Sequence, residues 1–537
     1  MLSLKCWQDE RSKFEKKGIK LPRFDVEAAR AAGAEQPSWI HFGGGNLYRA
    51  FHAAIAQDLL DAGALKGGVV VEETFSPLTI DEVYGPYHND ILQVTLSADG
   101  IAEERVLAST ASALFANPQR PEDYAQTRSY FEDDRLQLCT FTITEKGYAI
   151  RDLAGEGAAG PTGSTSTMGI VSSLLLARYR AGAAPIAMVS TDNFSRNGER
   201  FRDAVASVVG AWMEAGKVER GFLDYVSDEG RVSFPWTMID RITPNPSPET
   251  AKSLADQGFS DLPLIDAGHG ATFAGFSNTE EAHYLVIEDS FPNGRPEFEL
   301  GGVIMCDRET AERADTMKVT ACLNPLHTCL AVYGCLLGYT RIWQEMENEA
   351  LVRLIRHIGY DEDLPVVTSP GVIDPKEFID ELIEKRLPNK SLPDAPQRIA
   401  CDTSQKMPIR YGHTIKAYVD AGKDVSQLTY IPLAIAGWLR YLVGIGDDGK
   451  RFELGPDPRL DELTGHVAPL SLGVTDSDII HAAVEPIVSD ASLFLVDLYE
   501  VGLGAKVESL LAELISGVGA VSATLERHVS SHQACER

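Results

Sequence analysis

The feature that most constrains the fold of this chain is a short apolar segment that runs directly into three glycines. Trp39–Phe42 has the composition of a buried strand, and Gly43, Gly44 and Gly45 follow it at once. Residues 46–63 then carry apolar side chains at helical spacing and end at a glycine. A strand, a glycine turn and a helix bring backbone N–H groups and the positive end of the helix dipole to one place, which suits a pyrophosphate group.

A second predicted strand, residues 67–73, ends in Glu72 and Glu73 and completes a βαβ unit of the size of half a dinucleotide-binding domain. A carboxylate at this position accepts a ribose hydroxyl and repels a 2′-phosphate, so the pattern favours NAD over NADP. Tyr48 replaces the third glycine of the usual G-x-G-x-x-G motif, so the prediction depends on the strand, turn and helix together. The alternative is a glycine-rich turn that binds no ligand. The candidate cofactor-binding residues here are Gly43, Gly45, Asn46, Arg49, Glu72 and Glu73.

The rest of the chain predicts an α/β domain followed by a mainly helical one. Residues 136–144, 186–190 and 283–289 are predicted strands, and residues 155–163, rich in Gly, Ala and Pro, are a predicted loop. The later predicted helices are residues 312–343 with a break before Pro325, 375–385, 409–421, 428–442 and 492–514. We therefore predict an N-terminal Rossmann-type dinucleotide-binding domain, residues 1–300, and a mainly α-helical C-terminal domain, residues 301–537.

Charge and cysteine usage exclude several classes of protein. The chain has 49 Lys and Arg against 78 Asp and Glu, a net charge of −29, which argues against nucleic acids and anionic membranes as partners. The 8 cysteines form no C-x-x-C pair and no zinc-finger spacing, so we expect a reducing compartment and no metal. The first residues lack the apolar core of a secretion signal, and the longest nearly apolar run, residues 329–339, is too short to cross a bilayer. We therefore expect a soluble cytoplasmic protein.

From His41 to His52 the sequence begins to resemble the long-chain polyol and hexuronate dehydrogenases, the family of mannitol 2-dehydrogenase and fructuronate reductase. Further motifs follow in the order of that family, and the resemblance runs from about residue 38 to the C-terminal helices. These motifs are TITEKGY at 142–148, STDN at 190–193 with NG at 197–198, FPWTMIDRITP at 234–244, VIED at 286–289, the segment 317–327 from Met-Lys to His, and RIACDTSQK at 398–406.

The resemblance implies an oxidoreductase that uses NAD, requires no metal, and interconverts a secondary alcohol of an open-chain sugar derivative with its ketone. It implies a Rossmann-type domain, a helical domain and a site in the cleft between them. By resemblance Lys318 is the general base, while Asn193 and Asn324 hold the reacting oxygen, and Asn193 also adjoins the cofactor. The positions that contact substrate or support the site are Asp240, His327, Arg398 and Lys406.

Alcohol oxidation without a metal requires a side chain that takes the hydroxyl proton. A lysine does this only where burial or neighbouring positive charge lowers its pKa toward the working pH. Lys318 lies in the otherwise apolar stretch 317–323, where partial desolvation is expected. Asp315 matches an acidic position of the family, and the resemblance implies that it relays the proton to solvent. The alternative for Lys318 is a surface lysine whose stem lies along a helix.

The sequence departs from the family between two of these residues. Mannitol dehydrogenases have four residues between the lysine and the asparagine, whereas Lys318 and Asn324 have five. Pro325 disfavours helical geometry at Asn324 and suits the start of a new helix. We therefore predict that Asn324 caps a helix over residues 325–339, with His327 on its first turn and the extra residue in a bulge or non-helical turn. One unbroken α-helix over residues 317–339 would contradict this prediction.

The remaining candidates each have an ordinary structural alternative. Asn193 at a strand end also suits a turn or a helix cap. Asp240 can form a solvated ion pair with its neighbour Arg241. Arg398 and Lys406 suit a substrate carboxylate as well as a hydroxyl, but also a solvated helix face.

Within the family that this chain resembles, the altered Asn-Pro-Leu-His segment at 324–327 and the longer chain favour interconversion of D-mannonate and D-fructuronate, the fructuronate reductase or D-mannonate:NAD 5-oxidoreductase activity. The expected partner is thus a small sugar acid or polyol, and the oligomeric state stays open. Within the enzyme class the alternative is a mannitol or arabinitol 2-dehydrogenase. A non-catalytic NAD-binding or sugar-binding protein on the same fold is the alternative from a different class.

Overall fold

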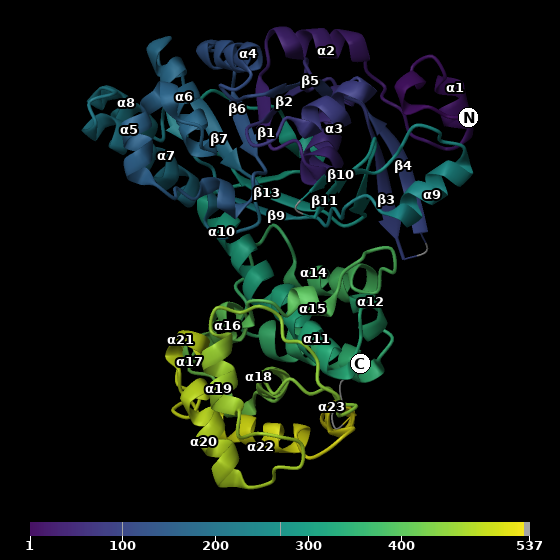
Figure 1. The fold of residues 1–537 in the computed structure, drawn as a ribbon, viewed down its shortest axis with the longest axis vertical. Helices are drawn as coiled ribbons and strands as arrows, with labels where there is room; N and C mark the ends of the chain where they lie inside the picture. Colours follow the sequence, from purple (N-terminus) through teal and green to yellow (C-terminus); the bar gives the residue numbers. More distant parts are fainter. Residues whose placement is uncertain (99, 269, 531–537) are drawn as a thin grey trace. The chain divides into compact units, whose positions relative to one another are not determined.

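The computed structural model describes residues 1–98, 100–268 and 270–530 and is drawn in Figure 1. It divides into two compact units, Met1–Asp315 (unit 1) and Thr316–Arg537 (unit 2). The boundary predicted near residue 300 lies before β14 (Ile304–Cys306) and α10 (Arg308–Met317), and α10 continues across the division.

Unit 1 is built on a six-stranded sheet in the order β5-β2-β1-β6-β7-β8, in which every neighbouring pair is parallel. Its strands are β1 (Trp39–Phe42), β2 (Val69–Glu73), β5 (Thr110–Phe115), β6 (Leu138–Phe141), β7 (Ile186–Ser190) and β8 (Val232–Ser233). This is the Rossmann order, in which the order of the strands reverses between β1 and β6 and ligands bind at the carboxyl ends of those strands. The predicted fold class is confirmed.

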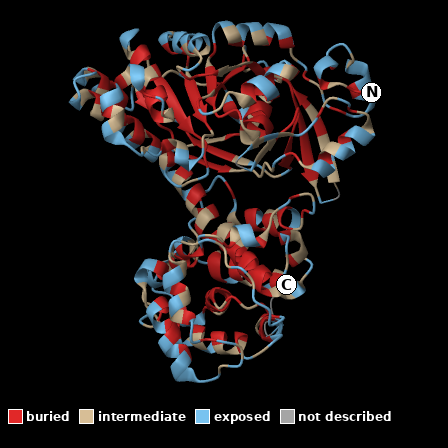
Figure 2. Cartoon of the chain, in the orientation of Figure 1, coloured by how far each residue is buried: buried red, intermediate tan, exposed pale blue. Residues whose placement is uncertain are grey.

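The two faces of this sheet pack against different partners because successive strand residues point to opposite sides. Ile40 and Phe42 of β1 pack into one core, which includes residues of α4, α6, α7 and α8. Trp39 and the β2 residues Val69 and Val71 pack on the other face with α3 (Ala53–Asp61). Figure 2 shows the strands almost wholly buried and the helices exposed on their outer sides. The four helices on the first face are α4 (Pro121–Glu132), α6 (Thr167–Arg180), α7 (Asn197–Glu214) and α8 (Arg220–Ser227).

Smaller sheets and the N-terminal segment complete unit 1. One sheet has the order β12-β3-β4, another has the order β14-β13-β9, and β10 pairs with β11. Their strands are β3 (Ile91–Ser97), β4 (Gly100–Leu107), β9 (Thr237–Asp240), β10 (Ile265–Gly268), β11 (Ala271–Phe273), β12 (Phe276–Glu280) and β13 (Tyr284–Glu288). The remaining helices are α1 (Arg11–Lys16), α2 (Val26–Glu35), α5 (Leu153–Gly163) and α9 (Pro248–Gln257).

The predicted loop over residues 155–163 is wrong, since most of α5 lies there. The side chain of Asp152 caps this helix by accepting a hydrogen bond from the N–H of Gly155 at 2.8 Å. The chain kinks at Gly160, which has φ 67°, just before Pro161. Capping and packing against α7 therefore outweigh the poor helix propensity of glycine and proline here.

Unit 2 consists of helices joined by loops and has no named strand among its described residues. Its α-helices are α11 (Asn324–Leu337), α12 (Ile342–Glu345), α13 (Glu349–Arg356), α14 (Pro375–Glu381), α15 (Pro396–Ile399), α16 (Thr403–Met407), α17 (His413–Asp420), α18 (Tyr430–Leu442), α19 (Leu460–Val467), α20 (Ser477–Val488), α21 (Ala491–Phe494), α22 (Gly504–Leu514) and α23 (Ala520–Ser530). Every residue of α18 is buried, so it forms the centre of the unit. The predicted single helix over 492–514 is wrong: Leu495 ends α21 with φ 61°, and α22 starts at Gly504.

Several helices contain π-helical turns, which hold one more residue than an α-helical turn. In unit 2 these are η7 (Lys318–Cys322), η8 (His357–Asp363), η9 (Leu382–Arg386) and η10 (Pro408–Gly412). Among the described residues, one mainly helical span, Arg308–Leu337, is long and apolar enough to cross a membrane, but 78% of its most apolar window is buried inside the structure. Such burial is typical of a core helix.

Candidate functional site

The glycine turn after β1 is shaped by two glycines and left uncovered at the third. Gly43 has φ 100°, and a Cβ there would lie 2.2 Å from the carbonyl oxygen of Thr142. A Cβ at Gly44 would lie 2.9 Å from the ring of Tyr84, whereas a Cβ at Gly45 would meet nothing within 4 Å. Gly43 and Gly44 are thus required by the fold itself, while Gly45 keeps the backbone open to close approach by a ligand.

Tyr48 explains how the turn dispenses with the third glycine of the motif. The chain passes from the turn into a π-helical turn, η2 (Tyr48–His52), before α3 begins. Tyr48 is fully buried, its hydroxyl lies 2.9 Å from Thr110 Oγ1, and its ring lies 4.5 Å from that of His41. The packed side chain of Tyr48 thus fills the space between the helix and the sheet, whereas the glycine usual at this position lets the helix and the sheet approach closely.

The two glutamates at the end of β2 have different environments. Glu73 accepts a hydrogen bond from the Gly44 N–H at 2.7 Å, and burial raises its pKa to about 7 against the opposing effect of that bond. Glu72 is fully buried and accepts a hydrogen bond from Thr127 of α4 at 2.8 Å. Burial raises its pKa well above the usual range. Glu73 therefore lies at the glycine turn, whereas Glu72 lies in the core between β2 and α4.

Asn46 and Arg49 connect the start of this helix to the strands of the smaller sheets. Asn46 Nδ2 donates to the carbonyl oxygen of Thr272 at 3.1 Å. Arg49 is fully buried and donates to the carbonyl oxygens of Ala274 at 2.5 Å and Phe276 at 3.4 Å. Burial lowers the pKa of Arg49 to about 10. The guanidinium thus satisfies backbone carbonyls inside unit 1, and its Nη1 also donates to Asn46 Oδ1 at 3.5 Å beside the glycine turn.

Two buried histidines, His41 and His52, link the strand ends beneath the turn, and no role was predicted for them beyond their place in the family motif. His41 Nδ1 lies 2.7 Å from Thr140 Oγ1, and its Nε2 lies 2.9 Å from Thr142 Oγ1. His52 Nε2 lies 2.9 Å from Thr191 Oγ1. Burial lowers the pKa of both imidazoles, that of His52 to about 3, so both are neutral. The ends of β1, β6 and β7 are therefore joined by neutral hydrogen bonds.

The TITEKGY and STDN motifs meet at the carboxyl edge of the parallel sheet. Asn193 follows β7 and is exposed at this edge. Beside it, buried Asp192 accepts hydrogen bonds from the N–H groups of Ile143 and Thr144, each at 2.9 Å, and from the Tyr148 hydroxyl at 2.8 Å. Burial raises the pKa of Asp192 against the effect of these bonds. Asp192 thus fixes the loop that presents Asn193, a role that the sequence alone did not reveal.

Asn197 extends this network to β9, which ends at Asp240. Asn197 Nδ2 donates to Thr237 Oγ1 at 2.8 Å, and its Oδ1 accepts from the Thr237 N–H at 3.0 Å. Asp240 is half-buried at the end of β9. Arg241 Nε donates to Thr279 Oγ1 at 2.6 Å. Arg241 is therefore directed at β12, which weakens the alternative of a solvated ion pair for these neighbours.

In unit 2, the extra residue between Lys318 and Asn324 is accommodated by η7. The Leu323 N–H donates to the Lys318 carbonyl oxygen at 3.2 Å, the five-residue step of a π-helix. Leu323 then leaves helical geometry with φ −129° and ψ −63°, and α11 begins at Asn324. The predicted bulge and break are confirmed, but Leu323 and not Asn324 is the N-cap, because the break already falls at Leu323. Lys318 is 2% exposed.

A second group of predicted residues gathers near the first turn of α11. His327 Nε2 lies 2.9 Å from Asp394 Oδ2, and Arg398 Nη2 lies 2.5 Å from Asp394 Oδ1. Burial raises the pKa of Asp394, but the hydrogen bond from His327, the charge of His327 and Arg398 together lower it to about 2. Asp394, which the sequence did not single out, therefore holds His327 and Arg398 in one cluster.

Lys406 on α16 reaches the same cluster at the end of α15. Its Nζ donates to the carbonyl oxygens of Ile399 at 2.8 Å and Cys401 at 2.5 Å. Burial, with the nearby charge of Arg410, lowers the pKa of Lys406 to about 8. Arg410 is a further member that the sequence analysis missed. The cluster is thus locally cationic within a strongly acidic chain.

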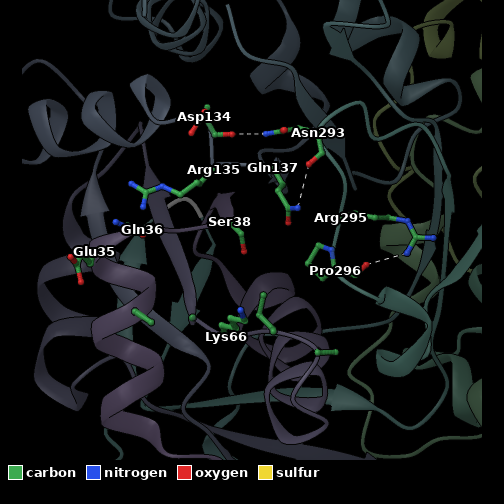
Figure 3. A pocket seen from close by; sticks show the side chains of 14 residues that line it. Glu35, Gln36, Ser38, Lys66, Asp134, Arg135, Gln137, Asn293, Arg295 and Pro296 are labelled. Carbon is green, nitrogen blue, oxygen red and sulfur yellow. Dashed lines mark hydrogen bonds between the residues drawn. The ribbon is translucent and has the colours of Figure 1, made fainter. Parts of the chain in front are cut away.

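A separate pocket lies at the opposite edge of the parallel sheet. It has a volume of about 760 Å³, and its lining includes Ser38 just before β1 and Gln137 just before β6. Figure 3 shows Asn293 directed at Asp134, and its Nδ2 donates to the Asp134 carbonyl oxygen at 2.7 Å. The amino ends of the strands form this pocket, so it is distinct from the edge that carries the glycine turn.

Within the described part of the chain, no three or more His, Cys, Asp or Glu residues are grouped to hold a metal.

Comparison with known proteins agrees with the architecture of both units. Residues 37–300 match the mannitol dehydrogenase Rossmann domain, and residues 314–481 match the mannitol dehydrogenase C-terminal domain. The D-mannonate oxidoreductase of Thermotoga maritima is 46% identical over 97% of both chains, and a mannitol 2-dehydrogenase of Pyrenophora tritici-repentis is 28% identical over 80% of this chain and 73% of its own. The ternary complex of Pseudomonas fluorescens mannitol 2-dehydrogenase with NAD and D-mannitol matches with a TM-score of 0.69 and 24% identity, over 96% of this chain and 97% of its own. Since both domain models match in order, this chain belongs to the mannitol dehydrogenase family.

Proposed function

We propose that this protein is an NAD-dependent oxidoreductase that interconverts D-mannonate and D-fructuronate. The observation that carries the proposal is the 46% identity to a D-mannonate oxidoreductase over 97% of both chains. Identity at this level extends through both units and not only through the nucleotide-binding one. The reaction exchanges a secondary alcohol for a ketone on an open-chain sugar acid, without a metal.

The glycine turn and its surroundings fit NAD, whose nicotinamide ring supplies the hydride acceptor when it is bound. The uncovered backbone at Gly45 suits the pyrophosphate, with Asn46 beside it. The Glu73 carboxylate, already 2.7 Å from the Gly44 N–H, suits a ribose hydroxyl and disfavours a 2′-phosphate. Arg49 and Glu72 instead support this turn from within the core.

We assign the proton transfer to Lys318, which takes the hydroxyl proton during oxidation and returns it during reduction. Its burial and its place on the η7 turn give its amine a fixed direction. Asn324 and Asn193 donate amide hydrogen bonds to the reacting oxygen as it gains negative charge. The contacts of the other polar groups of the substrate are assigned to Asp240, His327, Arg398 and Lys406.

Assays of NADH consumption with D-fructuronate, D-tagaturonate and D-fructose test this function. We expect kcat/KM for fructuronate to exceed that for fructose by at least about 100-fold, because a polar site rejects an analogue that lacks its partner group. A preference for fructose would favour the mannitol 2-dehydrogenase alternative instead. Oxidation of D-mannonate with NAD and with NADP tests the cofactor.

We also expect a cytoplasmic location, in line with the free cysteines at all seven described positions.

A further inference from the structure

Arg410 is a cation in the interior of unit 2 without an anionic partner. It lies on η10, is half-buried, and its Nη1 donates to Thr328 Oγ1 on α11. The Thr328 hydroxyl in turn donates to the Asn324 carbonyl oxygen at 2.9 Å. Arg410 is thus linked through one hydroxyl to a residue assigned to the reacting oxygen.

Two fully buried arginines of this chain, Arg178 and Arg440, have their guanidinium groups held by backbone carbonyl groups. Arg178 donates five hydrogen bonds to backbone carbonyls, and Arg440 donates three. Arg398 is exposed and pairs with Asp394. Among the described residues Arg410 pairs with no carboxylate, its charge acts on the nearby Lys406, and its Nε and Nη2 atoms stay accessible to solvent.

A buried guanidinium without a counter-charge is costly, and burial accordingly lowers the pKa of Arg410 to about 10. Such a cost is offset where a ligand supplies the anion. We propose that Arg410 binds the carboxylate of the substrate and thereby selects sugar acids over polyols. This inference rests on the proposed function and names the group that determines its substrate class.

The spacing along α11 agrees with the length of the substrate. Thr328 lies one helical turn beyond Asn324, a distance of about 6 Å along the axis. In D-mannonate the reacting C5 and the carboxyl C1 are four carbon–carbon bonds apart, or about 5 Å in an extended chain. A substrate whose C5 oxygen contacts Asn324 can therefore place its carboxylate at Arg410, where the two free nitrogens offer a bidentate contact.

Arg410→Met tests the inference, because methionine keeps an apolar stem and removes the charge. We expect kcat/KM for fructuronate to fall by about 100-fold, the usual consequence of truncating a charged hydrogen-bonding partner, while kcat/KM for fructose is unchanged or rises. Arg353→Met is the matched control, since Arg353 is exposed and pairs with Glu349 on α13. It should leave both values unchanged.

Equal losses with fructuronate and fructose would overturn the inference and leave Arg410 a purely structural role. Thermal melting gives a readout without turnover: mannonate should raise the Tm of the wild type but not of Arg410→Met. If the methionine variant does not fold, Arg410→Lys replaces it, with an expected loss of about tenfold on fructuronate alone, since lysine keeps the charge but not the fork. A wild-type enzyme without fructuronate reductase activity would instead refute the proposed function.

Discussion

At the residue scale, Lys318 is the most direct test of catalysis. We expect Lys318→Ala to lower kcat by about 10²–10⁴-fold, because no other assigned group can take the hydroxyl proton, while NADH binding is largely kept. Kinetics and a fluorescence titration with NADH measure the two effects. Lys416→Ala is the control, since Lys416 is an exposed lysine of unit 2 that pairs with Asp420. Unchanged turnover in Lys318→Ala would favour a non-catalytic sugar-binding protein.

Glu73 makes the choice of cofactor depend on pH. Burial raises its pKa to about 7, so the carboxylate is mostly neutral below that pH and mostly ionised above it. Only the ionised form repels a 2′-phosphate, so the preference for NAD over NADP should increase between about pH 6 and pH 8. In Glu73→Gln the preference should be small and should follow only the titration of the 2′-phosphate itself. Parallel pH profiles of kcat/KM for the two cofactors decide between these outcomes.

The location of a site residue could be predicted where its position in the sequence determines it. The direction of its side chain could not be predicted where contacts with distant parts of the chain determine it. Glu73 lies at the glycine turn as expected from the end of β2, but Glu72 faces the core because strand residues alternate. Arg49 follows the turn, yet carbonyl groups more than two hundred residues away in the chain accept its hydrogen bonds. Arg410 gave no sequence signal because it depends on the packing of η10 against α11.

At the scale of elements, different glycines of the turn after β1 serve the stability of the fold and the binding of the cofactor. Gly45→Ala should leave Tm unchanged, because its Cβ meets no protein atom within 4 Å, but should raise KM for NAD by about tenfold through loss of close backbone approach. Gly43→Ala should lower the stability of the fold by at least about 1–2 kcal/mol, since its φ of 100° and the carbonyl oxygen of Thr142 exclude a side chain. Melting curves and NAD titrations of both variants test the distinction. Equal loss of stability in both would contradict it.

The η7 turn that bears Lys318 depends on a buried hydrogen bond in unit 2. The Thr414 hydroxyl donates to Asp363 Oδ1 at 2.8 Å and lies 3.4 Å from the Thr320 carbonyl oxygen in η7. Thr414→Val should lower the free energy of unfolding by about 1–3 kcal/mol, because it leaves the buried Asp363 without this donor. We also expect kcat to fall with little change in KM, since the turn that orients Lys318 loosens.

The matched control for this variant is Thr464→Val. Thr464 lies on α19 and donates to a carbonyl oxygen of its own helix, that of Leu460 at 2.7 Å, and so bonds neither η7 nor a buried carboxylate. Urea unfolding and steady-state kinetics of the two variants separate stability from orientation. A stability loss in Thr414→Val with wild-type kcat would show that η7 holds Lys318 without this contact.

Regular elements could largely be predicted from periodicity, and irregular ones could not. β1 and β7 have the predicted bounds, because buried parallel strands are short apolar runs between clear breaks. The break before α11 was predictable because Pro325 suits the first turn of a new helix, but it falls one residue earlier than predicted, and the form of the inserted turn was not predictable. The helix α5 was missed because the cap and packing that stabilise it lie outside its own composition.

At the scale of the whole molecule, the total charge and the local charge have opposite signs. The chain carries −29, yet Arg398, Lys406 and Arg410 gather around the first turns of α11. Exposed carboxylates farther away than about 8 Å are largely screened at physiological salt, so the nearby cations should dominate the field felt by a bound anion. An acidic protein can thus attract a negatively charged sugar acid.

The sign of the local charge at the site can be measured from the dependence of KM on ionic strength. Between about 0.02 and 0.5 M NaCl we expect KM for fructuronate to rise severalfold, because salt weakens attraction between the anion and the cationic cluster. KM for fructose, which is neutral, should stay constant over the same range, and kcat should change little for either substrate. Arg410→Met should flatten the salt dependence for fructuronate. If KM for fructuronate instead falls as salt is added, repulsion by the net charge outweighs the cluster, and the local field at the site is negative.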